Sequence, residues 1–269
     1  MNIYKDLTLI IVSYRSEKLI HKNIEIIRKF KTIIVDNSNS NNLERLVNKY
    51  NNINLIKSPI NIGYGKASNL AVSFAKTPFI LTVNPDLILN ENAIKNLFDT
   101  FLNDLDNIGI LAPALLDNNM NNRTNGSISY IDKLKGKKIS NSITNIAVGN
   151  TCCRFLMGSC FLMKRDFFNF LGGFDKNFFM YFEDNDLCDR AIKSGKYIME
   201  VPSSKFIHLQ NSSSERKFFT GSKLSIIHKI SSYIYLKKNI SFFFLIYQII
   251  KNILDYFQRL LFNLLRFKF

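Results

Sequence analysis

The sequence predicts an α/β domain in which helices cover a mainly parallel β-sheet. Over residues 7–112, short apolar runs typical of buried strands alternate with helical patterns, the order expected of a layered α/β fold. Polar, short side chains end three of those runs, and in such sheets ligands bind beyond the carboxyl ends of the strands. The fold class therefore also predicts where a binding site lies.

The expected elements follow one another closely along the chain. Strands are expected at residues 7–14, 32–36, 53–57, 78–83, 109–112, 155–163, 196–201 and 205–208. Helices are expected between the first two strands and then at 43–50, 64–75, 91–102 and 164–171. Residues 117–150 are rich in Asn, Ser, Gly and Lys without a repeat, so we expect a long loop there.

Candidate binding residues stand at the ends of the first, second and fourth expected strands. Ser13 ends the first strand, Asp36 ends the second, and Asn84-Pro85-Asp86 follows the fourth. The Asp36 carboxylate can accept a hydrogen bond from a pyrimidine ring, or it can close an Asx-turn within its own loop. The side-chain oxygens of Asn84 and Asp86 can hold Mg²⁺ or Mn²⁺ against a diphosphate, or the segment can simply form a turn.

A glycine-bearing loop, Asn61-Ile-Gly-Tyr-Gly-Lys-Ala-Ser-Asn69, opens the helix expected at 64–75. It resembles phosphate-cradling loops, but the GxGxxG spacing is absent because only Gly63 and Gly65 occur, and it has no P-loop lysine. Gly63 can let the backbone approach a bound nucleotide closely. A plain turn followed by a helix cap fits the same residues.

The stretch Phe178–Arg190 has an unusual composition, because aromatic residues run directly into a cluster of acids. Glu183, Asp184, Asp186 and Asp189 stand close together in a chain whose net charge is +15. Carboxylates beside an apolar wall cost solvation free energy unless a partner or a chemical task uses their charge. A helix that begins at Glu183 places Asp184 on the inward face and Asp186 and Asp189 on the outward face. The acids are therefore either partners of the helix macrodipole or parts of a site.

Composition narrows the classes of protein. Hydrophobic residues make up 46% of the chain, which excludes a disordered protein. The four cysteines form no CxxC pair and no framework spacing, so we expect reduced thiols in a cytoplasmic protein. No nucleic-acid partner is expected, because basic and aromatic residues are not interleaved before the tail and the acidic cluster would repel phosphates.

The expected boundary between an α/β domain at 1–214 and a tail at 215–269 follows a change in charge. The tail carries ten basic and two acidic residues, so that +8 of the net +15 lies there. Its second helical piece is apolar with one polar stripe, and its longest uncharged run, Phe242–Ile250, is too short to span a bilayer. We expect this amphipathic tail to lie on a membrane surface, with packing on the domain itself as the alternative.

Six of these motifs occur in an order that resembles the inverting family-two glycosyltransferases with the GT-A fold. They are Val-Ser-Tyr at 12–14, Val-Asp-Asn-Ser at 35–38, the loop at 61–69, Asn-Pro-Asp at 84–86, Gly-Gly-Phe-Asp at 172–175 and Phe-Met-Tyr-Phe-Glu-Asp-Asn-Asp-Leu-Cys-Asp-Arg at 179–190. More narrowly, they resemble bacterial rhamnosyltransferases of O-antigen and other surface polysaccharide biosynthesis. The resemblance implies a Rossmann-like mixed sheet flanked by helices.

The resemblance also implies roles for individual residues. Asp184 matches the catalytic base, and Glu183 is its neighbour in the acceptor site. Asp86 and His208 match metal-binding residues, which implies Mg²⁺ or Mn²⁺ as cofactor, although a lone histidine such as His208 is more often structural. The implied nucleotide-sugar-binding residues are Ser13, Asp36, Asn61, Gly63, Asn69 and Asn84. Arg15 stands where many members have Asn, which leaves the edge of the base pocket open.

The implied activity is hexosyl transfer, with dTDP-rhamnose as the expected donor and a lipid-linked saccharide as the expected acceptor. Asp184 would deprotonate an acceptor hydroxyl, which attacks the anomeric carbon opposite the leaving diphosphate and inverts its configuration. We expect a cytoplasmic enzyme, peripheral on the inner face of the cell membrane. A UDP-hexose-dependent enzyme of the same fold and a non-enzymatic basic membrane-binding protein are the alternatives. A sugar-phosphate nucleotidyltransferase is disfavoured, because the first strand end, residues 12–17, contains no glycine.

Overall fold

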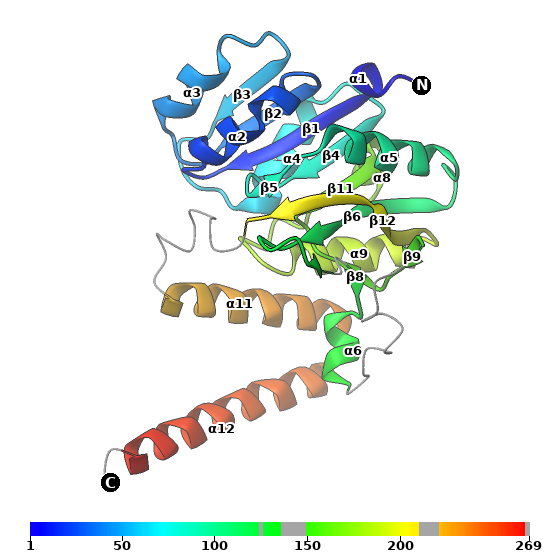
Figure 1. The fold of residues 1–269 in the computed structure, drawn as a ribbon. Coiled ribbons are helices and arrows are strands. Elements are labelled where there is room, and N and C mark those ends of the chain that lie inside the picture. The colour runs from blue at the N-terminus through cyan, green and yellow to red at the C-terminus, as the bar shows by residue number, and fades with distance from the viewer. Residues whose placement is uncertain (124–125, 136–148, 210–220, 267–269) are drawn as a thin grey trace.

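In the computed structural model, which describes residues 1–123, 126–135, 149–209 and 221–266, one mixed sheet forms the centre of the protein. Its main strands run in the order β3-β2-β1-β4-β11-β6-β12-β5, and the short strands β7 and β9 pair with β6 and β12. Helices lie on both faces of the sheet, and two long helices follow at one end (Figure 1). The predicted α/β class with flanking helices and a C-terminal helical tail is confirmed.

The first half of the sheet is parallel, as the alternation of strands and helices predicts. Its strands are β1 (Leu7–Ser13), β2 (Lys31–Asp36), β3 (Ile53–Lys57) and β4 (Phe79–Val83), and its helices are α1 (Ile3–Asp6), α2 (Glu17–Ile27), α3 (Asn41–Val47) and α4 (Tyr64–Phe74). The register aligns Ser13 of β1 with Asp36 of β2. The polar ends of the parallel strands therefore share one edge of the sheet, which is the edge where the sequence places the site.

The second half makes the sheet a mixed one. Its elements are β5 (Leu87–Ile88), α5 (Glu91–Leu102), β6 (Ile108–Leu116), β11 (Cys160–Lys164), α8 (Arg165–Phe170), α9 (Glu183–Lys193) and β12 (Tyr197–His208). β11 runs antiparallel between β4 and β6, whereas β12 runs parallel to β6. The two strands expected at 196–201 and 205–208 are one strand, whose pairing with β6 is irregular between Val201 and Lys205.

Two expectations for the middle of the chain are wrong. The strand expected at 155–163 divides into β10 (Phe155–Leu156) and β11, because a turn at Gly158 and Ser159 interrupts it. The long loop expected at 117–150 contains β7 (Asn122–Arg123), β8 (Gly126–Ser127) and α6 (Tyr130–Leu134), and β9 (Thr151–Cys152) follows it. Residues 124–125 and 136–148 of that expected loop lie outside the described residues.

Two apolar cores hold the layers together, one on each face of the sheet. The first packs α2, α3 and α5 against β1 and β4 through fully buried residues such as Ile20, Leu43 and Phe98. The second packs α4, α8 and α9 against the other face through residues such as Ala71 and Leu187. Burying a large apolar side chain contributes about 1.5–3 kcal/mol, so these cores fix the positions of α4 and α9 beside the polar edge.

The tail is helical in two pieces, α11 (Gly221–Asn239) and α12 (Phe242–Arg266), as predicted. α11 packs on the domain, where its Tyr235 and Leu236 are buried against Phe178 and Phe182. α12 extends away from the sheet, as Figure 1 shows, and large apolar side chains such as Phe243 remain exposed on it. Among the described helices, none is both long and apolar enough to cross a membrane.

Candidate functional site

A cavity of about 660 Å³ opens at the carboxyl edge of the sheet. Its wall combines strand ends of the sheet with the first turn of α9, the short helix α6 and the helix α11. Five of the predicted site residues line this cavity: Asn84, Asp86, Glu183, Asp184 and His208. The described structure therefore brings together side chains from Asn84 to His208, which stand 124 positions apart in the sequence.

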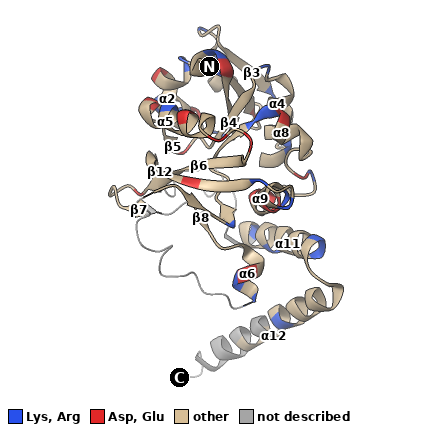
Figure 2. Ribbon diagram, turned by 90° about the vertical axis from the view of Figure 1, so that its right-hand side faces the viewer, with Lys and Arg blue, Asp and Glu red and all other residues tan. Residues whose placement is uncertain are grey.

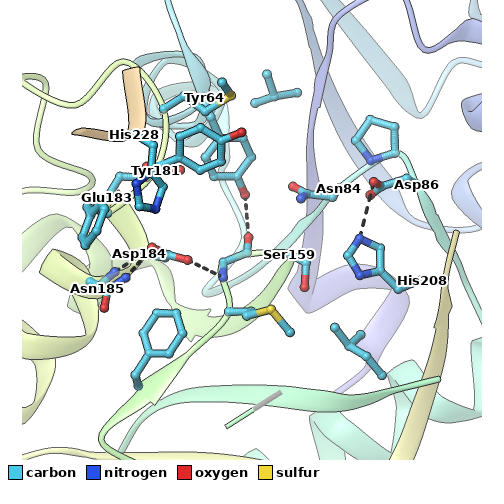
Figure 3. Close-up of a pocket in the computed structure, with 18 of the residues that line it drawn as sticks. Tyr64, Asn84, Asp86, Ser159, Tyr181, Glu183, Asp184, Asn185, His208 and His228 are labelled. Atoms are coloured by element: carbon cyan, nitrogen blue, oxygen red, sulfur yellow. Dashed lines mark hydrogen bonds and ion pairs between the residues drawn. The ribbon is translucent and has the colours of Figure 1, made fainter. Parts of the chain in front are cut away.

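One side of the cavity holds Asp86 and His208. The imidazole Nε2 of His208 lies 3.4 Å from the Asp86 carboxylate (Figure 3). This contact arises because the short strand β5 pairs antiparallel with the end of β12, aligning Leu87 with His208. The Leu209 amide also donates to the Asp86 carbonyl, at 2.9 Å. The pairing of the last two strands of the sheet thus places a histidine beside the predicted metal-binding carboxylate.

The same pair fits a divalent cation only in part. Asp86 is 8% exposed, and its Oδ1 atom has no hydrogen-bond partner among the described residues. A buried carboxylate oxygen without a partner is costly, and a cation would satisfy it. No group of three or more His, Cys, Asp or Glu side chains suited to a metal occurs in the described part of the chain. Asp86 and His208 can therefore hold Mg²⁺ or Mn²⁺ only if phosphate oxygens or water complete the coordination.

The opposite side of the cavity is the first turn of α9, with Glu183 and Asp184 (Figure 3). Asp184 Oδ2 accepts a hydrogen bond from the Gly158 amide at 3.1 Å, and its Oδ1 accepts from the backbone and side-chain amides of Asn185 at 2.8 and 3.1 Å. Burial raises the pKa of Asp184 above its ordinary value, although these hydrogen bonds act to lower it. A carboxylate that is held in one orientation with a raised pKa is suited to act as a base.

The space around Asp184 is tight, because Gly158 packs against its side chain. A Cβ atom on Gly158 would lie 2.8 Å from the Asp184 Cβ, closer than real Cβ contacts. The Tyr64 hydroxyl donates to the Gly158 carbonyl at 3.1 Å, and burial raises the pKa of Tyr64 above its ordinary value. The turn between β10 and β11 therefore packs directly against the side chain of the candidate base, Asp184.

The predicted loop Asn61–Asn69 faces the acidic segment. The Asn61 side chain accepts from the Gly63 amide at 2.9 Å. Gly63 has φ +84°, and a Cβ there would lie 2.3 Å from the carbonyl oxygen of Phe179. Glycine is required at this position because the approaching backbone is that of Phe179. Asn61, Gly63 and Asn69 are not among the residues that line the cavity, so their predicted contacts with a nucleotide stay predictions.

Residues 8–172, more than half of the chain, match the protein family described as Glycosyl transferase family 2. The chain belongs to this family. It is therefore a glycosyltransferase, and the family assignment confirms the resemblance drawn from its six motifs.

Several characterised proteins are similar to this glycosyltransferase. The low-salt glycan biosynthesis hexosyltransferase Agl10 of Haloferax volcanii is 28% identical over 221 residues, which cover 76% of this chain and 67% of that protein. The N-acetylglucosaminyl-diphospho-decaprenol L-rhamnosyltransferase of Mycobacterium tuberculosis is 28% identical over 241 residues, covering 78% of this chain and 75% of that protein. Rhamnosyltransferase WbbL of Escherichia coli is 28% identical over 255 residues, which cover 86% of this chain and 92% of that protein.

Solved structures support the fold. A crystal structure of GalNAc-T7 with UDP, GalNAc and Mn²⁺ superposes on this chain with a TM-score of 0.59 at 15% identity. The match covers 78% of this chain. A crystal structure of S. aureus TarS gives a TM-score of 0.59 at 14% identity and covers 88% of it. The chain spans 44% and 40% of those two structures, so it corresponds to less than half of each. The likeness confirms a GT-A-like mixed sheet.

Ser13 and Asp36, two predicted donor-binding residues of the glycosyltransferase, lie at the strand ends beside the cavity without lining it. Strand alternation gives the reason for Ser13, because its neighbours Val12 and Tyr14 face the cavity. The Asp36 carboxylate accepts from the amides of Ser38 at 2.9 Å and Ser40 at 3.2 Å, and also from the Ser38 hydroxyl. The Asx-turn alternative therefore describes this structure, and a contact between Asp36 and a pyrimidine stays a prediction.

The expectation that Asp186 and Asp189 face outward is wrong. Asp186 is 2% exposed, accepts a hydrogen bond from Arg190 Nε at 2.8 Å, and forms an ion pair with Lys238 of α11. Asp189 accepts from the hydroxyl of Tyr235 on α11 at 2.5 Å. Both acids face solvent on an isolated α9, but α11 covers this face and supplies basic and hydroxyl partners. Figure 2 shows α9, with its acids, beside α11, whose charged residues are all basic.

Several residues that line the cavity were not predicted from the sequence. They are Tyr14, Tyr64, Tyr130, Lys133, Gly158, Ser159, Tyr181 and His228, among others. Tyr64 and Tyr181 stand inside motifs that carried the resemblance, so their position there was a usable signal. Tyr130 and Lys133 belong to α6, within the stretch where the sequence predicts a loop, and His228 belongs to the tail. Nothing in the local pattern of those three residues points to a cavity.

Proposed function

We propose that this glycosyltransferase transfers L-rhamnose from dTDP-rhamnose to a lipid-linked saccharide acceptor, with inversion at the anomeric carbon. The observation that carries the proposal is the arrangement of one cavity, with Asp184 on one wall and the Asp86–His208 pair on another. Single displacement needs one base near the attacking hydroxyl and separate stabilisation of the leaving diphosphate. The names of two relatives as rhamnosyltransferases favour rhamnose as the sugar.

In this mechanism Asp184 removes the proton from the acceptor hydroxyl as that oxygen attacks the donor sugar. The Gly158 and Asn185 amides hold its carboxylate in place, so little rearrangement is needed when the proton is transferred. Glu183 borders the acceptor side of the cavity. Attack from the side opposite the diphosphate inverts the anomeric configuration.

The leaving group is a nucleoside diphosphate whose negative charge grows during transfer. Asp86 and His208 are the residues that would hold Mg²⁺ or Mn²⁺, and the cation would neutralise part of that charge. Asn84 precedes this pair on the same edge and lines the cavity, where its amide can donate to a phosphate or sugar oxygen. The cavity can therefore separate a donor side from an acceptor side.

A lipid-linked acceptor would explain why the tail combines exposed apolar side chains with basic ones. α12 exposes a series of apolar side chains, including Phe243 at 83%, while ten of the chain's basic residues lie in the tail. Apolar and basic side chains together favour binding to an anionic membrane surface. We therefore propose that the enzyme works at the inner face of the cell membrane, where a lipid-linked acceptor would be presented to it.

A UDP-hexose is the second donor class, because the name of the relative Agl10, hexosyltransferase, specifies neither rhamnose nor a nucleotide. A donor screen distinguishes the two. Release of nucleoside diphosphate is measured with dTDP-rhamnose and with several UDP-hexoses, each with Mg²⁺ or Mn²⁺ and a lipid-diphosphate-linked sugar. Preference for dTDP-rhamnose by at least about tenfold in kcat/KM is expected, which is about 1.4 kcal/mol of transition-state discrimination. Preference for a UDP-hexose would contradict rhamnosyl transfer, and no turnover with any donor would contradict the proposed activity.

A further inference from the structure

The two residues directly before Glu183 and the candidate base Asp184 have a strained backbone. Tyr181 and Phe182 have φ values of 70° and 66°, in the left-handed region that residues other than glycine rarely adopt. Phe182 is also the N-cap of α9, and its side chain makes no capping hydrogen bond. A strained turn of this kind persists only when its surroundings hold it. Because Glu183 and Asp184 follow at once, the conformation of this turn sets the direction of both carboxylates.

One face of α11 supplies contacts that hold the turn. The Ser231 hydroxyl donates to the Met180 carbonyl at 2.7 Å, and this pair is buried. The His228 ring packs on the rings of both strained residues, with centroids 5.4 Å from Tyr181 and 5.1 Å from Phe182. The helical spacing of three residues between His228 and Ser231 places both on the same side of α11.

The same face continues onto α9. Tyr235 packs on Phe182 with centroids 5.5 Å apart, and its hydroxyl donates to Asp189 at 2.5 Å. One turn further, Lys238 forms ion pairs with Asp175 at 2.7 Å and with Asp186. α11 thus contacts the acidic segment before, within and after the strained turn.

We propose that α11 is a positioning element for the transfer reaction, in which Ser231 and His228 hold the Met180–Phe182 turn and thereby aim Asp184 into the cavity. The inference rests on the proposed role of Asp184 as the base. The apolar cluster under α11 is small and contains Phe178, Phe182, Tyr235 and Leu236 as its buried members, separate from the two cores of the sheet. Loss of a contact at the turn can therefore alter Asp184 while the sheet stays folded.

Two neighbouring serines on α11 provide a matched test. Ser231 donates to Met180 of the turn, whereas Ser232, which is also buried, donates to Lys229 of its own helix and interacts with Tyr130 instead of the turn. Ser231→Ala should lower kcat by between about fivefold and a hundredfold, while the KM for the donor stays within about twofold. Ser232→Ala should leave both near the wild-type values. Equal effects of the two substitutions, or a loss confined to KM, would overturn the proposal.

A pair of substitutions at His228 separates ring packing from chemistry of the imidazole. His228→Phe keeps an aromatic ring against Tyr181 and Phe182, so it should retain clearly more of kcat than His228→Ala. Equal losses in both variants would contradict a packing role.

Hydrogen exchange tests the same contact without any activity. The amide of Tyr64 donates to the Phe179 carbonyl and the amide of Asp186 to the Phe182 carbonyl, so both amides report on the segment. Ser231→Ala should speed exchange of these two amides by about fivefold or more relative to Ser232→Ala, with the amides of β1 unchanged. Faster exchange together with normal kcat would show that the turn is held but does not position the base. If the wild-type protein transferred no sugar, the proposed function would fail, whereas the exchange result would still show whether Ser231 holds the turn.

Discussion

Asn69 holds the backbone of Phe174 from both sides. Its Oδ1 accepts from the Phe174 amide at 2.8 Å, and its Nδ2 donates to the Phe174 carbonyl at 2.7 Å. The two residues are separated by 105 positions in the sequence. A side chain predicted to lie along a nucleotide therefore joins α4 to the segment that leads into the acidic cluster.

Replacing Asn69 by alanine should weaken this junction. Two buried backbone groups of Phe174 would lose their partner, so the free energy of unfolding should fall by about 1–3 kcal/mol in urea denaturation. Ser73→Ala, on the same helix, is the control, because among the described residues the Ser73 hydroxyl bonds only to the Leu70 carbonyl of its own helix. A fully stable Asn69→Ala variant with a strongly raised donor KM would instead support direct contact between Asn69 and the nucleotide.

Gly158→Ala should displace the candidate base. The added Cβ would meet the Asp184 Cβ at 2.8 Å, and Asp184 must shift because the contact involves the root of its side chain. We expect kcat to fall by about tenfold to a hundredfold, with donor binding retained. Gly149→Ala, where a Cβ would meet nothing within 4 Å, is the matched control. A Gly158→Ala variant with unchanged kcat would show that the turn at Gly158 does not orient the base.

Asp184→Asn should remove the base and lower kcat by about 10²–10⁴-fold while the donor still binds. In the wild type only the ionised carboxylate can accept the proton. Since burial raises its pKa, kcat should rise as the pH increases through a value above the ordinary aspartate pKa of about 3.9, and then level off. A pH profile of kcat measures the position of that limb. Full turnover of Asp184→Asn would refute its assignment.

His208→Ala should raise the concentration of Mn²⁺ or Mg²⁺ needed for half-maximal activity by about tenfold to a hundredfold. The reason is that the site would keep the Asp86 carboxylate but lose the His208 imidazole, which lies 3.4 Å from it. His21→Ala is the control, because His21 lies on α2 and is not among the residues that line the cavity. Undiminished wild-type activity in excess chelator would contradict a metal at this pair.

Deleting residues 240–269 should leave a folded protein that no longer binds anionic vesicles. The deletion removes the exposed apolar face of α12 but keeps α11, whose Tyr235 is packed into the domain. Vesicle sedimentation measures the loss, and circular dichroism confirms that the domain is intact. A full-length variant with Phe243→Ser and Ile250→Ser should lose most of the same binding, since both side chains are exposed. Unchanged vesicle binding after the deletion would exclude the tail as the membrane contact.

Local patterns predicted much of the fold and part of the site. Buried apolar runs located β1, β2 and β4, because a strand that is covered on both faces reads as a continuous apolar run. The helical period placed Asp184 on the inward face of α9, together with Leu187 and Cys188, which are fully buried. The same period failed for Asp186, because its partner Lys238 comes from a helix that arrives 52 positions later.

The need for a glycine at position 63 was also predictable, but its partner was not. Residue type indicates that a backbone must come close, and only the fold shows that this backbone is that of Phe179. His228 is a similar case, because its place in the cavity depends on how α11 packs and not on any local motif. A single sequence therefore does not predict which distant segments contact one another.

The contact between Gly63 and Phe179 has a mechanical consequence. The amide of Tyr64, at the start of α4, donates to the Phe179 carbonyl at 3.1 Å, with no side chain between the two backbones. α4 packs on β1 and β2, whose ends carry the predicted donor-binding residues Ser13 and Asp36. This hydrogen bond therefore joins the two walls of the cavity directly, and the wall that carries Glu183 and Asp184 can move outward only if the bond breaks.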